Sequence, residues 1–158
     1  MPSDGALLVL GADGCRGGGW VVALIDGEGE LHWEWADDTK ALLAIADEYD
    51  ADAVAIDVPI GLPRLGEVRA CDGLARARLG ARRSSVFAAP PREVLSCVSY
   101  AAARPLAPTL SAQAFGLVPR IREVDEALRA AGADIHRRVV ECHPEVAFAA
   151  MAAGRLSL

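Results

Sequence analysis

The chain has 158 residues, of which 53% are hydrophobic and 24% are charged, and this composition excludes an intrinsically disordered protein. Sixteen basic and 22 acidic residues give a net charge of −6, which argues against a protein held to nucleic acid by bulk positive charge. The length is that of one domain, so we predict a single domain over residues 1–158.

The cellular setting is predicted from the cysteines and the apolar runs. The four cysteines form no C-x-x-C pair, and we interpret them as reduced thiols of a cytoplasmic protein. The N-terminus has neither a basic start nor the long apolar run of a signal peptide. No stretch approaches the roughly 20 apolar residues of a membrane span, so no membrane partner is expected.

The first part of the chain predicts three strands, a helix and a fourth strand. Alternating or continuous apolar residues predict strands over residues 6–12, 19–25, 30–35 and 53–58, with a hairpin turn at residues 26–29. Thr39 is placed to cap a helix over residues 40–49. A right-handed crossover through this helix makes the fourth strand parallel to the first.

The second part predicts mainly helices. They are expected over residues 67–79, 91–103, from Ser111 to Pro119, 119–131 and 144–153, with a fifth strand over residues 137–142. We therefore expect an α/β fold with a mixed five-stranded sheet, flanking helices and a helical insertion over residues 62–117.

Three strands end in or next to a carboxylate. Asp13 follows the first strand, Asp57 ends the fourth and Glu141 ends the fifth. In this topology the carboxyl ends of the three strands fall on one edge, where open α/β sheets bind ligands. Hard divalent cations prefer such oxygen ligands, so we predict that the three acids bind Mg²⁺ or Mn²⁺. For each acid alone, a turn or capping role is the alternative.

An arginine-rich segment offers a place for phosphate. Residues 64–92 contain seven arginines and two acids, so this segment carries +5 and the remainder −11. Arginine forks match phosphate oxygens, and we predict phosphate binding by Arg16 and by a turn that contains Arg82, Arg83, Ser84 and Ser85. A solvated helix face, with serines that satisfy local backbone groups, is the alternative.

His143 stands beside Glu141 and precedes Pro144 at a helix start. It is a candidate acid or base that orients water or a leaving group. A histidine that caps the helix or is satisfied by its neighbours is the alternative. The three tryptophans lie in predicted strands, and we expect them in the core or covering it rather than as base-stacking platforms.

Several of these segments, in order along the chain, resemble one family. The segments GADGCRGGGWVVA, AIDVPIGLP, CDGLARARLGARRSSVFAAPPREV and ECHPEVAF, and a stretch from Gln113 to Asp125, are similar to the ribonuclease H-like nucleases of the domain of unknown function 429 family. The resemblance implies a ribonuclease H-like fold and metal-dependent phosphodiester cleavage. It assigns Asp13 and Asp57 as the acids of strands one and four. It also assigns Glu141, with His143 and Glu145, to an E-x-H-P-E motif.

One departure from the family concerns the C-terminus. Members that resemble this chain usually continue past the GRLSL region into a helix that carries another acidic motif, whereas the sequence ends at Leu158. We therefore expect that the last metal ligand and the C-terminal helix are missing. A sheet face left bare by that helix would favour a homodimer.

These observations predict a metal-dependent nuclease that hydrolyses phosphodiester bonds in nucleic acid or acts on a nucleotide phosphate. Asp13 with the glycines after it also resembles the first phosphate loop of sugar-kinase and actin-like ATPases. A nucleotide phosphate-binding, ATPase-like protein is therefore one alternative. A non-catalytic interaction module, favoured by the short C-terminus, is another.

Overall fold

The computed structural model describes residues 7–154. They form two compact units, the first made of the chain up to Val58 with Glu123–Cys142, the second of Pro59–Arg122 with the residues from His143 onward. The predicted insertion, residues 62–117, falls entirely within the second unit. The assignment of the whole chain to one domain stays a prediction, and residue 6 of the expected first strand lies outside the described residues.

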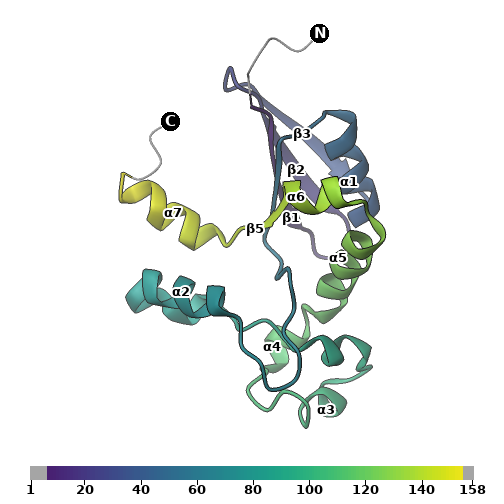
Figure 1. Ribbon diagram of the computed structural model, residues 1–158, viewed down its shortest axis with the longest axis vertical. Helices are drawn as coiled ribbons and strands as arrows, with labels where there is room; N and C mark the ends of the chain where they lie inside the picture. The colour runs from purple at the N-terminus through teal and green to yellow at the C-terminus, as the bar shows by residue number, and fades with distance from the viewer. Residues whose placement is uncertain (1–6, 155–158) are drawn as a thin grey trace. The chain divides into compact units, whose positions relative to one another are not determined.

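The first unit contains a five-stranded sheet with the order β3-β2-β1-β4-β5 (Figure 1). Its strands are β1 (Val9–Gly14), β2 (Trp20–Ile25), β3 (Leu31–Ala36), β4 (Ala53–Ile56) and β5 (Val139–Glu141). β2 is antiparallel to β1 and β3, whereas β4 is parallel to β1 and β5. The prediction of a ribonuclease H-like mixed sheet with flanking helices is confirmed.

The two faces of this sheet differ in burial. One face forms the core, with Leu10, Trp20, Val22, Val54 and Ile56 fully buried. Helix α1 (Thr39–Glu48) adds its buried Leu42, Leu43 and Ala46 to that core. The opposite face carries Leu31, Trp33 and Trp35, which are 48–64% exposed. Trp20 is therefore a core residue, whereas Trp33 and Trp35 are not, and the expected homodimer stays a prediction.

The start of α1 differs from the prediction by one residue. The N-cap is Asp38, whose Oδ1 accepts a hydrogen bond from the backbone N–H of Ala41 at 2.8 Å. Thr39 is the first helical residue and is fully buried. Aspartate is preferred over threonine at N-caps, so the cap shifts to Asp38.

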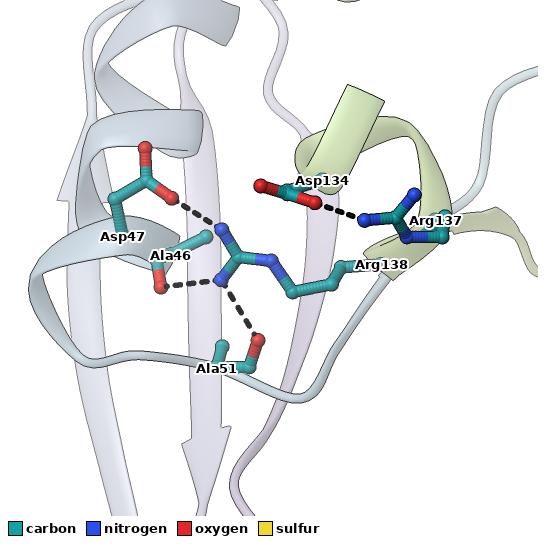
Figure 2. Close-up of polar contacts among 6 residues, drawn as sticks. All are labelled: Ala46, Asp47, Ala51, Asp134, Arg137 and Arg138. Atoms are coloured by element: carbon teal, nitrogen blue, oxygen red, sulfur yellow. Dashed lines mark hydrogen bonds and ion pairs between the residues drawn. The ribbon is translucent and has the colours of Figure 1, made fainter. Parts of the chain in front are cut away.

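A single arginine connects distant parts of the first unit. Arg138, the last residue of α6 (Ala133–Arg138), donates to the backbone oxygen of Ala51 at 3.0 Å and pairs with Asp47 of α1. Figure 2 shows its guanidinium reaching Ala46, Asp47 and Ala51. Helix α6 was not predicted, because its polar residues were assigned to the loop and the start of the strand over 137–142.

The second unit is built from short helices. It contains α2 (Ala70–Leu79), the 3-10 helices η1 (Gly80–Ser85) and η2 (Arg92–Ser96), α3 (Tyr100–Ala103), α4 (Ala112–Phe115) and α7 (Pro144–Ala152). The prediction of one helix over residues 91–103 is wrong. The helix is interrupted because Ser99 caps α3, its Oγ accepting from the N–H of Ala102 at 3.2 Å. Ser111 caps α4 as predicted, but α4 ends at Phe115 and does not reach Pro119.

Helix α5 (Val118–Ala130) lies close to its predicted range of 119–131. Gly132, predicted as its stop, also serves as the N-cap of α6. Within the described residues, none of the helices has the length and apolar character needed to cross a membrane.

Candidate functional site

The ends of β1 and β4 bring two of the predicted acids to the same level of the sheet. Ala12 is in register with Ile56, and Asp13 and Asp57 each follow one residue later. Neighbouring parallel strands lie about 4.8 Å apart. Successive side chains of a strand alternate between faces, so Asp13 of β1 lies on the face opposite the buried Ala12. Asp57 is exposed and is the first residue after β4.

Glu141 occupies a different row. It ends β5 and pairs with Ile56. Because side chains alternate along a strand, Glu141 shares the face of Ile56, whereas Asp57 comes one residue later. Within residues 7–154, no group of three or more His, Cys, Asp or Glu side chains could hold a metal ion. Of the three predicted metal ligands, the register thus brings together Asp13 and Asp57 and separates Glu141 from them.

Cys142 is the first residue after β5, as Asp57 is the first residue after β4. Its backbone N–H donates to the oxygen of Ile56 at 2.9 Å. Burial raises the pKa of the Cys142 thiol, and the negative charge of Asp57 raises it further. The thiol is therefore neutral at physiological pH and does not compete with oxygen ligands for a hard cation.

The loop that follows Asp13 is a tight turn made possible by glycine. Gly17, Gly18 and Gly19 all have positive φ angles, of 91°, 111° and 73°. Gly19 also lies under the indole of Trp35, since a Cβ at this position would be 2.2 Å from the ring. The turn presents Arg16 to solvent only three residues from Asp13. Of the predicted phosphate ligands, Arg16 is the one that belongs to the same unit as Asp13, whereas residues 82–85 belong to the second unit.

The remaining predicted residues belong to the second unit, where two of them, Ser85 and His143, form a cluster with Glu145. Ser85 Oγ lies 2.6 Å from a carboxylate oxygen of Glu145, to which it donates. A ring nitrogen of His143, Nε2, lies 3.2 Å from the backbone oxygen of Ser85. His143 is the N-cap residue of α7 and Glu145 lies in its first turn. These contacts attach the end of η1 to the start of α7.

The predicted roles of His143 and Ser85 in binding or catalysis stay predictions. The capping alternative for His143 describes its position, although its side chain makes no capping hydrogen bond. Arg82, Arg83 and Ser84 are exposed, and within the described residues none of their own side chains takes part in a hydrogen bond or ion pair. The predicted site residues thus fall into two sets. The three acids belong to the first unit, and His143 and the 82–85 turn belong to the second unit.

A family model described as "Protein of unknown function (DUF429)" matches residues 11–158. The chain belongs to the DUF429 family. The matched range contains the acids of β1, β4 and β5 as well as the cluster around His143, so this DUF429 chain carries every predicted site residue within the family region. Neither the curated proteins nor the solved structures contain a match to it.

Proposed function

We propose that this DUF429 protein is a metal-dependent phosphodiesterase that cleaves nucleic acid. The observation that carries the proposal is the register of β1 and β4, in which Ala12 pairs with Ile56 and Asp13 and Asp57 are the next residues along the chain. Two carboxylates at neighbouring strand ends repel one another unless a cation joins them.

The donor set fits Mg²⁺ or Mn²⁺. Mg²⁺ usually keeps several waters and is bound through one or two carboxylates together with substrate phosphates. Two aspartates without a third acidic ligand therefore suit a cation whose coordination is completed by the substrate. When bound, such a cation stabilises charge on phosphate oxygens and makes a bound water more acidic.

Residues of the first unit would orient the substrate. Asp13 and Asp57 would hold the cation, and Arg16 in the turn after Asp13 would donate to a phosphate oxygen. Water adds across one P–O bond, which yields a phosphate monoester and an alcohol. Because Glu141 pairs with Ile56 and not with Asp57, we expect it to contribute less to metal binding than the two aspartates.

The proposal is tested by hydrolysis of single-stranded, duplex and hybrid oligonucleotides in the presence of Mg²⁺ or Mn²⁺. Asp13→Asn and Asp57→Asn should each reduce the rate at least about 100-fold, by the loss of metal-held charge stabilisation. Asp50→Asn is the matched control, because Asp50 is exposed and its positive φ of 50° is tolerated by asparagine. The rate of the Glu141→Gln variant should lie between those of the two site variants and that of the Asp50→Asn control.

Two results would overturn the proposal. One is the absence of metal-dependent cleavage of every substrate, with ATP binding then favouring the ATPase-like alternative and no ligand at all favouring the interaction module. The other is cleavage that persists at the wild-type rate in both Asp13→Asn and Asp57→Asn.

A further inference from the structure

The second unit contains a groove of about 630 Å³, which is within the range of small-molecule sites, roughly 300–1,000 Å³. It lies between α2, η1, the segment that follows η1, and α4. Most of its lining is apolar, including Val86, Phe87, Pro90, Pro91 and Leu110. Among residues 7–154, two arginines and no acidic side chain line it.

The walls of the groove are held by a buried polar network. Asp72 of α2 forms an ion pair with Arg69 at 2.8 Å, and the two side chains are only 13% and 7% exposed. Asp72 also accepts from the N–H of Ala89 at 3.0 Å, and Arg76 Nε donates to the oxygen of Val86 at 3.0 Å. The 86–89 wall is thereby fixed to α2 before any ligand arrives.

The polar groups that remain in the groove are mainly hydrogen-bond donors. Arg76 and Arg83 supply guanidinium groups, and Ser84, Thr109 and Ser111 supply hydroxyls. Asp72 is compensated by Arg69, so the charges of Arg76 and Arg83 are not balanced by an acid in the lining. Arginine forks with hydroxyls match an anion that presents several acceptor oxygens, as phosphate does.

Phe87 indicates the other half of the ligand. Phe87 is 44% exposed although it lines the groove, and an exposed aromatic face can stack on a planar ring. We propose that this groove binds an organic phosphate monoester with an aromatic ring, of the size of a nucleoside monophosphate. The proposal is independent of the metal site, since every group it uses lies in the second unit.

Adenosine monophosphate is the probe, titrated into the full chain in the presence of EDTA and followed by calorimetry or NMR. Binding should be saturable, and it should be at least about tenfold tighter than that of adenosine or of inorganic phosphate, because each carries only half of the recognised chemistry. Working without a divalent cation keeps this result separate from the proposed hydrolysis.

Matched arginine variants then locate the site. Arg83→Gln should weaken binding at least about tenfold, whereas Arg78→Gln should leave it unchanged, since Arg78 is exposed on α2 but does not line the groove. Ala88→Trp, at an exposed lining position, should block binding by filling the space. Equal affinities of Arg83→Gln and Arg78→Gln, or no saturable binding by the wild-type chain at millimolar concentration, would overturn the proposal.

Discussion

Glu123 accepts two hydrogen bonds from Thr39, one from the backbone N–H at 2.7 Å and one from the hydroxyl at 2.6 Å. Thr39 is fully buried, so these two donors have no access to water. The pair joins α5 to the first turn of α1 within the first unit, across 84 positions of the chain.

Glu123→Ala should therefore lower the free energy of unfolding by about 2–3 kcal/mol, because it leaves two buried donors of Thr39 unsatisfied. Glu126→Ala is the control, since Glu126 is exposed on the same helix; its effect should stay within about 0.5 kcal/mol. Urea denaturation measures both. Equal effects of the two substitutions would show that the Thr39 contact adds no stability.

Two adjacent arginines allow a second comparison. The side chain of Arg138 is 22% exposed and is bonded to Ala51 and Asp47, whereas that of Arg137 is 73% exposed and pairs with Asp134 (Figure 2). Arg138→Met should cost about 1–3 kcal/mol, because the backbone oxygen of Ala51 loses a charged donor. Arg137→Met should cost less than about 0.5 kcal/mol. A thermal melt in which Arg137→Met is the less stable variant would contradict this.

The contact between Gly19 and Trp35 predicts an energetic coupling. Gly19→Ala should cost about 2–3 kcal/mol, since it places a side chain at a positive φ and against the indole ring. In a Trp35→Ala background the same change should cost about 1 kcal/mol less, because the clash is gone. A double-mutant cycle by chemical denaturation gives this difference, and a cost that is identical in both backgrounds would exclude the contact.

Tyr49 should produce a pH effect at alkaline pH. The hydrogen bond from its hydroxyl to Glu34, at 2.9 Å, and the negative charge of Glu34 raise the pKa of Tyr49 above its ordinary value. The stability contributed by this contact is present below the ordinary tyrosine pKa and is lost as the pH rises through the folded-state pKa. Glu34→Gln should lower the pKa of Tyr49 in an absorbance titration, and an unchanged or higher pKa would contradict the assigned cause.

Much of the sheet was predictable because its strands carry local signals. Apolar runs around Leu10 and Val54 and the turn at residues 26–29 locate the strands. The right-handedness of the crossover connection makes β4 parallel to β1. Local signals failed where a short polar residue interrupts a helix pattern. Ser99 splits the helix predicted over residues 91–103, and the polar helix α6 was assigned to a loop and the start of a strand.

The candidate site was predictable only in part. The ends of β1 and β4 were each predicted two residues from their observed positions, since β1 ends at Gly14 rather than residue 12 and β4 at Ile56 rather than residue 58. Asp13 and Asp57 were nevertheless predicted at the same edge of the sheet. The position of Glu141 depends on whether β5 ends level with Ile56 or one residue later, and a shift of one residue moves a side chain to the other face. The contact of Ser85 with Glu145 spans 60 positions, and no sequence periodicity reports such a distance.

The most direct test of the metal site is paramagnetic broadening by Mn²⁺, which detects weak binding in the absence of substrate. Substoichiometric Mn²⁺ added to the ¹⁵N-labelled chain should first broaden the amide signals of Asp13, Gly14, Asp57 and Val58. The Asp13→Asn and Asp57→Asn double variant should lose this selectivity, whereas Asp50→Asn should keep it. Broadening that begins equally at other exposed acids, such as Glu28 and Glu30, or that persists in the double variant, would contradict a metal site formed by Asp13 and Asp57.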